Sequence, residues 1–212
     1  MNRLRVRFKR GDSVKFISHL DIIRLWHRAL RRAGIDLAYS EGFNPHPRIA
    51  LAAPLALGIT SDAELMDIFI NRHISPHSFA ALLGRQLPPG IEILQVCLVA
   101  PIMPALQSQV RFAEYTVDIE GAAGDVAVAI ASLLAKEHLP WQHQRDTGTR
   151  SYDLRPLIDD LWLASWHNSS GFIGMRLRCG SNGSGRPEQV IKALGLGEPS
   201  AIHRTRLILG TG

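Results

Sequence analysis

The hydrophobic period changes in the middle of RLRVRFKRGDSVKFISHLDIIRLWHRALRRAG, which spans residues 3–34. Residues 3–9 alternate basic and apolar side chains, a period that predicts a strand with one buried face and one basic outer face. From Ser18 onward the apolar side chains gather on one side of a helical projection of residues 19–33, and Gly34 follows as a stop signal. The stretch therefore predicts a strand and an amphipathic helix that open a split β-α-β unit.

The rest of the chain predicts two units with the same element order. Further strands and a helix of the first unit are expected at 49–53, 64–70, 75–86 and 91–99. Two prolines and few charges in PIMPALQSQ indicate a linker over residues 101–110. Strands and helices of the second unit are expected at 111–120, 124–137, 141–145, 161–166, 172–179, 186–195 and 202–209. We expect an α+β fold of two tandem ferredoxin-like units, residues 1–100 and 111–212.

Positive charge is concentrated near the N-terminus. The chain holds 24 lysines and arginines against 19 aspartates and glutamates, a net charge of +5, and 20 of the 24 are arginines. Residues 1–48 alone hold 11 basic and 4 acidic side chains. This unequal distribution predicts that an anionic partner contacts the N-terminal quarter.

Several classes of protein are disfavoured by the composition. The two cysteines, Cys97 and Cys179, form no CxxC pair and no zinc or iron–sulfur ligand pattern, so we expect neither a metal nor another cofactor. The first ten residues lack the apolar region of a signal peptide. The longest apolar-rich stretch, residues 49–59, is well short of the roughly 20 residues that span a membrane. We therefore expect a cytoplasmic protein with no membrane contact.

The polar side of the first predicted helix carries the strongest candidate site. Four arginines share this side: Arg24, Arg28, Arg31 and Arg32. Arginine forms forked hydrogen bonds to phosphate and releases counterions on binding, so this row predicts contacts to a nucleic-acid backbone. The alternative is an ordinary solvated helix face that Asp21 partly neutralises. The basic outer face of the adjoining strand favours the binding interpretation.

A proline-rich loop, SEGFNPHPR at residues 40–48, is the second candidate. Gly42 permits a positive φ, and the prolines Pro45 and Pro47 restrict the backbone on both sides of His46. Side chains that suit stacking and hydrogen bonding to a single-stranded base are Tyr39, Phe43, Asn44, His46 and Arg48. The alternative is a stiff connection that places Phe43 in the core and uses Asn44 to cap the backbone.

Acid–base chemistry has weaker support in the sequence. The candidates are His46, His19 and His27 near the arginine row, and Asp153 in SYDLRPLIDD. No carboxylate stands at a diagnostic spacing from these histidines. Asp153 and Arg155 are interpreted either as a pair that lines a cleft or as a turn stabilised by Asp153.

A glycine-rich segment, CGSNGSGRPEQ at residues 179–189, precedes the last predicted helix. The free N–H groups of that helix N-terminus are suited to an anion. The segment lacks the GK[ST] ending of a P-loop and the glycine spacing of a dinucleotide site, which favours a flexible loop.

The chain resembles the bacterial radical-SAM-linked domain of unknown function over nearly its whole length. The resemblance is carried by FISHLDIIRLWHRALRRAGIDLAYSEGFNPHPRIALAAPLALGITSDAELMDI (16–68), YDLRPLI (152–158), GRPEQVIKALGLG (185–197) and IHRTRLIL (202–209). Proteins of that family are fused to, or encoded beside, a radical-SAM protein with a cobalamin-binding-type domain, often near a ribonuclease of the E/G type. The resemblance implies a radical-SAM partner and RNA or ribosome work, and it supplies no catalytic residues.

A shorter similarity links Ser18, His19, Leu20 and Asp21 to the opening of the first helix in ferredoxin-like proteins that process CRISPR repeat RNA. That likeness concerns mainly the fold, so a nuclease activity is analogy.

Three hypotheses follow from the sequence. The first is a non-catalytic RNA-binding accessory module, which positions RNA for a radical-SAM partner in RNA or ribosome modification. The second is an RNA-processing or RNA-modifying enzyme that uses His/Asp acid–base chemistry. The third is a protein-interaction domain whose basic face docks a radical-SAM protein.

Overall fold

The computed structural model describes residues 1–120, 126–145, 148–167, 170–180 and 183–210. The chain divides into two compact units, Met1–Val110 with Leu209–Gly212 (unit 1) and Arg111–Ile208 (unit 2). Both units combine helices with antiparallel strands, so the predicted α+β class is confirmed. In the described part of the chain, no helix has the length and hydrophobicity that crossing a membrane requires.

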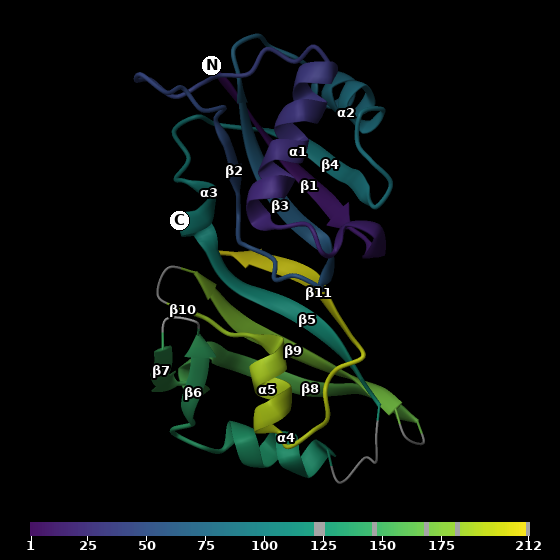
Figure 1. The fold of residues 1–212 in the computed structure, drawn as a ribbon, viewed down its shortest axis with the longest axis vertical. Helices are drawn as coiled ribbons and strands as arrows, with labels where there is room; N and C mark the ends of the chain where they lie inside the picture. Colours follow the sequence, from purple (N-terminus) through teal and green to yellow (C-terminus); the bar gives the residue numbers. More distant parts are fainter. Residues whose placement is uncertain (121–125, 146–147, 168–169, 181–182, 211–212) are drawn as a thin grey trace. The chain divides into compact units, whose positions relative to one another are not determined.

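Unit 1 shows the predicted element order. Its strands and long helices are β1 (Asn2–Arg10), α1 (His19–Arg32), β2 (Ile49–Leu51), β3 (Thr60–Ile70), α2 (Pro76–Gly84) and β4 (Ile91–Val99). A 3₁₀ turn, η1 (Asp12–Val14), joins β1 to α1. The sheet has the order β2-β3-β1-β4, and each neighbouring pair is antiparallel (Figure 1).

Helix α1 forms where the sequence predicts it, because its start and its buried face are encoded locally. The Ser18 side chain accepts a hydrogen bond from the backbone N–H of Asp21 at the N-cap. Gly34 adopts a positive φ of 68° just beyond the C-terminal end. Trp26 is fully buried and meets Phe8 of β1 edge-on, with ring centroids 4.7 Å apart. The apolar side of α1 thus packs on the sheet, and its polar side stays outside.

The prediction of a basic outer face on β1 is wrong for Arg3 and Arg5. The Nε atoms of Arg3 and Arg5 both donate to the Asp67 carboxylate at 2.8 Å, and Arg5 lies opposite Asp67 in the β1–β3 register. The side chains of Arg3 and Asp67 are 2% and 1% exposed. Lys9 forms an ion pair with Asp62 at 3.3 Å, and Arg7 donates to the backbone carbonyl of the same residue. The acidic partners come from β3, so the alternation of β1 alone does not reveal them.

The segment predicted as a linker, residues 101–110, is packed into unit 1. It contains the short helix α3 (Leu106–Gln109), in which Leu106 is 1% exposed. Arg3 also donates to the backbone carbonyls of Met103 and Pro104 at 2.6 and 2.8 Å. The segment therefore supplies acceptors for a buried cation, a role that its proline content does not indicate.

The strands of unit 2 follow a related order. Its elements are β5 (Val110–Glu120), α4 (Val126–Leu134), β6 (Pro140–Arg145), β7 (Gly148–Asp153), η2 (Arg155–Leu157), β8 (Ile158–His167), β9 (Ser170–Gly180), β10 (Gly183–Ser184), α5 (Pro187–Ala193) and β11 (Ala201–Leu209). The strand order is β8-β9-β5-β11, and β10 pairs with the end of β9. Parts of three predictions lie outside the described residues: 124–125 of a helix, 168–169 of a turn and 181–182 of the glycine-rich segment.

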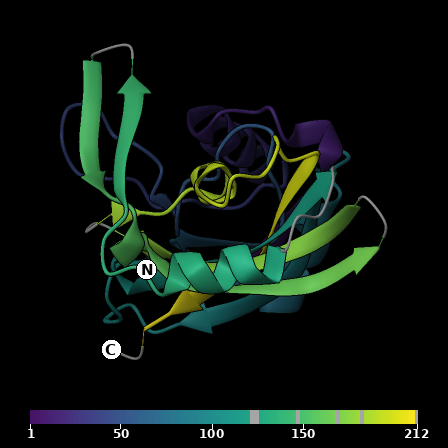
Figure 2. The ribbon, with the colours of Figure 1, turned by 90° about the horizontal axis from the view of Figure 1, so that it is seen from below.

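One strand predicted in unit 2 is half of a hairpin. The expected strand at 141–145 lies within β6, which pairs with β7 in a separate two-stranded sheet. The hairpin projects from the rest of unit 2 (Figure 2). Its strands pair Trp141 with Tyr152 and Pro140 with Asp153. The hairpin interrupts the element order expected for unit 2, and the ferredoxin-like assignment of both units stays a prediction.

Candidate nucleic-acid interface

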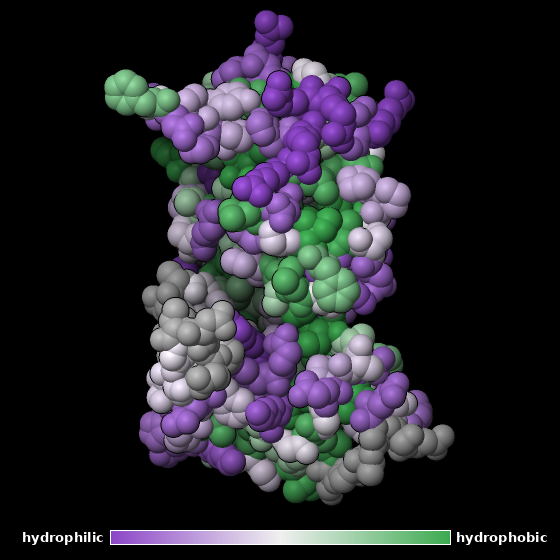
Figure 3. Space-filling model, viewed as in Figure 1, coloured by the Kyte–Doolittle hydropathy of each residue, from purple (hydrophilic) through white to green (hydrophobic). Residues whose placement is uncertain are grey.

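The four arginines of α1 differ in whether their side chains form hydrogen bonds or ion pairs. Arg24 forms an ion pair with Asp21 at 3.0 Å, although its side chain is 67% exposed. Arg32 donates to the backbone carbonyl of Gln86 at 2.7 Å. Arg28 and Arg31 are exposed and have no hydrogen-bond or ion-pair partner among the described residues. Hydrophilic side chains gather over α1 in the space-filling view (Figure 3).

The loop after α1 is closed by backbone contacts. The Ser40 N–H donates to the His46 carbonyl at 2.8 Å, and the His46 N–H donates to the Ser40 hydroxyl at 3.0 Å. The Arg48 N–H donates to the carbonyl of Ala38 at 2.9 Å. Gly42 has a φ of 118°, a conformation that side chains other than glycine rarely adopt. The expected stiff loop is therefore present, and it projects from unit 1 (Figure 1).

The side chains of this loop are presented to solvent. Phe43 is fully exposed, and Asn44, His46 and Arg48 are also exposed. The alternative that places Phe43 in the core is therefore wrong. The Arg48 guanidinium lies 4.5 Å from the centroid of the Phe69 ring on β3, so it sits at the base of the loop.

His27 and Tyr39 connect the arginine row to the loop. The His27 Nε2 and the Tyr39 hydroxyl are 3.3 Å apart, and the two rings meet edge-on with centroids separated by 6.3 Å. Burial, followed by the charge of Arg31, lowers the pKa of His27. Tyr39 remains 45% exposed. The structure therefore places the arginine row of α1 and the proline-rich loop, which were predicted separately, on one side of unit 1.

The histidines proposed for acid–base chemistry in unit 1 lack an orienting carboxylate. In the described part of the chain, neither the His19 nor the His46 imidazole has a hydrogen-bond partner. His27 contacts a tyrosine hydroxyl rather than an acid. A general base held in one orientation is thus not formed by these three residues.

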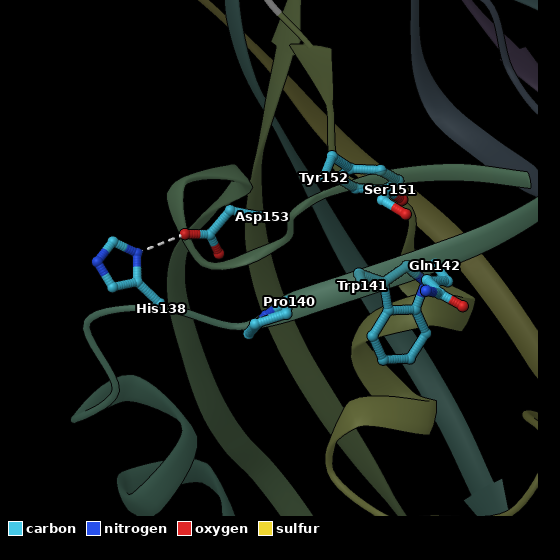
Figure 4. Close-up of a pocket in the computed structure, with 7 residues that line it drawn as sticks. All are labelled: His138, Pro140, Trp141, Gln142, Ser151, Tyr152 and Asp153. Carbon is cyan, nitrogen blue, oxygen red and sulfur yellow. Dashed lines mark hydrogen bonds and ion pairs between the residues drawn. The ribbon is translucent and has the colours of Figure 1, made fainter.

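A histidine that the sequence did not single out does have a carboxylate partner. In unit 2, His138 Nδ1 lies 2.8 Å from Asp153 Oδ2 (Figure 4). The other carboxylate oxygen of Asp153 accepts the backbone N–H groups of Leu139 and Arg155 at 2.8 and 3.0 Å. The hydrogen bond from His138, followed by that from the Leu139 N–H, lowers the pKa of Asp153.

Asp153 and Arg155 do not form the side-chain pair that lines a cleft. The Arg155 guanidinium donates instead to the carbonyls of Leu134, Lys136 and Ile158 at 2.8–3.0 Å. Two of these carbonyls lie at the C-terminal end of α4, where unsatisfied acceptors favour a cation. The alternative of a turn stabilised by Asp153 is confirmed.

The His138–Asp153 pair borders a groove of about 560 Å³ at the base of the β6–β7 hairpin. Trp141, Gln142, Ser151 and Tyr152 continue its lining (Figure 4). A strand in GTRSYD, residues 148–153 after the strand at 141–145, was missed in the sequence because this mostly polar run shows no apolar alternation. Treated as a returning strand, it places Asp153 opposite Pro140 and so near His138. Among the described residues, no group of three or more His, Cys, Asp or Glu is arranged to hold a metal ion.

The family of the chain is identified by its sequence. A protein-family model with the description "Uncharacterized protein conserved in bacteria (DUF2344)" matches residues 3–187. The chain belongs to this family. No match is found among curated proteins.

Solved structures with a similar fold come from H/ACA complexes. Chains of an archaeal box H/ACA sRNP Nop10–Cbf5 complex and a Cbf5–Nop10–Gar1 complex match at 10% and 8% identity, with TM-scores of 0.49 and 0.51. A chain from an H/ACA RNP bound to a substrate RNA containing 2'-deoxyuridine matches at 10% identity and a TM-score of 0.47. The matches cover 96–97% of this chain and 47–48% of those chains, so it spans about half of their length. At these identities the likeness concerns the fold alone.

Proposed function

We propose that this DUF2344 protein is a non-catalytic RNA-binding accessory module that acts with a radical-SAM partner in RNA or ribosome modification. The observation that supports it most directly is the pair Arg28 and Arg31. Both are exposed, neither forms a hydrogen bond or an ion pair among the described residues, and they lie on one face of α1 beside an exposed aromatic loop.

The two elements supply complementary interactions with RNA. Guanidinium groups three residues apart on a helix are neighbours, so Arg28 and Arg31 present adjoining charges to a phosphate backbone. The fully exposed Phe43 ring offers a face on which an unpaired base can stack, worth about 1–3 kcal/mol per base. Closure of the loop through Ser40 and His46 lowers the entropy cost of presenting that ring.

The radical-SAM partner is supported by the family resemblance and by the cysteine content. The chain holds only Cys97 and Cys179, so it lacks a three-cysteine ligand set for an iron–sulfur cluster. In this proposal the partner supplies the radical chemistry and this protein supplies RNA contacts. The strand orders β2-β3-β1-β4 and β8-β9-β5-β11 support the further proposal that both units are ferredoxin-like.

The test compares two double variants of equal charge. A labelled single-stranded RNA of 20 uridines is titrated with wild type, with Arg28→Ala/Arg31→Ala and with the control Arg7→Ala/Arg72→Ala. The control removes two exposed arginines of unit 1 that do not belong to the arginine row of α1, which consists of Arg24, Arg28, Arg31 and Arg32. We expect a loss of affinity of at least about tenfold for the first variant and less than about threefold for the control. Equal losses, or no binding by wild type, would refute the proposal.

A second candidate function is favoured by the His138–Asp153 pair. A carboxylate on Nδ1 fixes the orientation of an imidazole and leaves Nε2 for proton transfer, as in acid–base enzymes. An RNA-processing or RNA-modifying enzyme would lose its activity on total RNA in His138→Gln and Asp153→Asn, while His46→Ala would keep it. Single-turnover assays in which all three variants behave as wild type would eliminate this candidate.

A further inference from the structure

Strand β4 is the last strand of the sheet in unit 1 (Figure 1). It pairs with β1 along one edge, and no other strand of the described residues pairs with it. Leu94 is skipped in the β1–β4 register, so residues 95–99 form the longest regular stretch of the strand. Because the backbone N–H and C=O groups along a free edge can pair with a further strand, another chain can bind there.

The surface around this edge is poor in charge, in contrast to the arginine row of α1. Residues 91–110 contain a single charged side chain, Glu92, and helix α2 contains no Lys, Arg, Asp or Glu. Natural proteins protect a free sheet edge with charged side chains, and a surface centre depleted of charge is a feature of protein–protein interfaces. The regular stretch QVCLV has no such protection, so its composition favours an interface.

Large apolar side chains are exposed on the same elements and just beyond β4. Leu98 of β4 is 49% exposed, and Ile102, which follows β4 by three residues, is 92% exposed. Leu94 of β4 and Leu82 of α2, which packs against β4, are exposed as well. A set of exposed apolar side chains around an unpaired strand is typical of a surface that another protein covers.

The direction of each side chain in the regular stretch follows from its partner in β1. Val96 is opposite Val6, and Leu98 is opposite Leu4. Both β1 residues are fully buried in the core to which α1 and α2 contribute, so Val96 and Leu98 lie on the helix-covered face of the sheet. Side chains alternate along a strand, and Cys97 therefore lies on the opposite face.

We propose that the free edge of β4 pairs with the same edge of a second copy of the chain, in antiparallel register with a twofold axis at Cys97. In this register Val96 of each copy is opposite Leu98 of the other, and Gln95 is opposite Val99. Apolar side chains thus meet on the helix-covered face. Glu92 lies outside the paired stretch, so the pairing places no like charges opposite each other.

A second copy suits this edge because the stretch is complementary to itself. A twofold axis brings the same surface of both copies together, so one uncharged, apolar strand supplies both sides of the interface. The even register also keeps the helices of both copies on one face of the joined sheet. Helix α2 of each copy then flanks the axis, and the exposed Leu82 is added to the covered surface.

The first test measures the oligomeric state of the full chain by sedimentation equilibrium. Wild type should be a dimer at about 100 μM, and Leu98→Arg should raise the dissociation constant of the dimer at least about tenfold, because it puts a charge on the paired edge. The matched control is Leu57→Arg, since Leu57 is 59% exposed in unit 1 and lies outside β4 and α2. The control should change the dissociation constant less than about twofold. Circular dichroism checks that both variants stay folded.

The second test reports the register and does not depend on a charged variant. Residues directly opposite in an antiparallel pair have Cα atoms about 4.5–5.5 Å apart, a separation that a disulfide can span. Diamide, which takes up two electrons and two protons from a pair of thiols, should therefore join two chains through Cys97. A covalent dimer is expected in wild type and in Cys179→Ser, whose cysteine is buried, and none in Cys97→Ser.

Three results would overturn the proposal: a monomeric wild type at about 100 μM, a dimer that Leu98→Arg and Leu57→Arg affect equally, and a dimer that forms no crosslink through Cys97. The proposal does not rest on RNA binding. Arg28→Ala/Arg31→Ala should stay dimeric while it loses affinity for the 20-uridine RNA, so failure of the dimer and failure of the proposed function are distinguishable.

Discussion

Two pairs of arginines in unit 1 have opposite surroundings. Arg3 and Arg5 of β1 converge on the buried carboxylate of Asp67, and their side chains are 2% and 13% exposed. Arg28 and Arg31 of α1 are exposed and form no hydrogen bond or ion pair among the described residues. Both pairs belong to the same basic quarter of the chain, so local charge density alone does not distinguish them.

The difference shows how one residue type serves the fold in one place and remains free for a ligand in another. Burial of a guanidinium is tolerated only when a counter-charge and hydrogen-bond acceptors surround it. Asp67 and the carbonyls of Met103 and Pro104 meet that need for Arg3. An arginine on a helix surface has no such requirement, because water solvates it until an anion replaces that water.

The largest expected effect comes from removal of the shared carboxylate. Asp67→Ala leaves two guanidinium groups around an empty partner position, and we expect the free energy of unfolding to fall by about 3–5 kcal/mol. Urea denaturation followed by circular dichroism measures it. The control is Asp12→Ala, whose ion pair with Lys15 is at the surface with the aspartate 84% exposed, so less than about 1 kcal/mol is expected. Equal losses in the two variants would contradict the assignment of Arg3 and Arg5 to the fold.

Removal of Arg28 and Arg31 should have the opposite effect: it should leave the stability nearly unchanged and weaken RNA binding. Arg28→Ala/Arg31→Ala should leave the free energy of unfolding within about 0.5 kcal/mol of wild type. The slope of log K for single-stranded RNA against log salt should become shallower by about 1.4, at roughly 0.7 per lost phosphate contact. Binding titrations at several salt concentrations measure this slope. An unchanged slope would show that the α1 row does not contact phosphates.

Replacement of Asp21, the acidic partner of Arg24, should change RNA affinity by a smaller factor. Its carboxylate holds Arg24 at 3.0 Å, so Asp21→Asn releases that arginine and removes a negative charge from the row. We expect RNA affinity to rise about two- to fivefold at low salt and the gain to shrink as salt increases. Arg24→Ala in the same assay should weaken binding less than Arg28→Ala does. A larger loss for Arg24→Ala would reverse our ranking of the two arginines.

The smallest effect is expected from the His27 contact with Tyr39. The pKa of His27 is lower in the folded protein, so the neutral imidazole is favoured there. Its contribution to stability is therefore present at neutral pH and is lost as the pH falls below about 6.5, the ordinary histidine value. Denaturation at pH 7.5 and 5.5 should show a larger loss of stability for wild type than for His27→Gln. Equal losses would show that burial beside Tyr39 does not affect His27.

Several parts of this molecule were predictable because their signals are local. The start of α1 depends on Ser18 and its end on Gly34, and both stand within one turn of the helix. The stiff loop follows from Gly42 and the prolines that flank His46, which restrict the backbone without help from distant residues. Its exposed Phe43 was one of two outcomes that the sequence left open.

The groove in unit 2 shows where prediction from sequence ended. Only one strand of the hairpin was recognised, so Asp153 had no visible neighbour on the returning strand. The His138–Asp153 bond joins residues fifteen positions apart, and it depends on the register of that hairpin and on the turn held by Arg155. Register and turn geometry are properties of the assembled chain.

The alternation in β1, the capped amphipathic helix and the excess of arginines are all contained in the sequence, because period, capping and charge act over a few residues. Tertiary structure alone decided which arginines are free. It placed Asp67 of β3 between Arg3 and Arg5, and it left Arg28 and Arg31 facing water. The physical reason is that the protonation, solvation and pairing of a charge depend on groups distant in sequence, and only folding brings those groups to within a few ångströms.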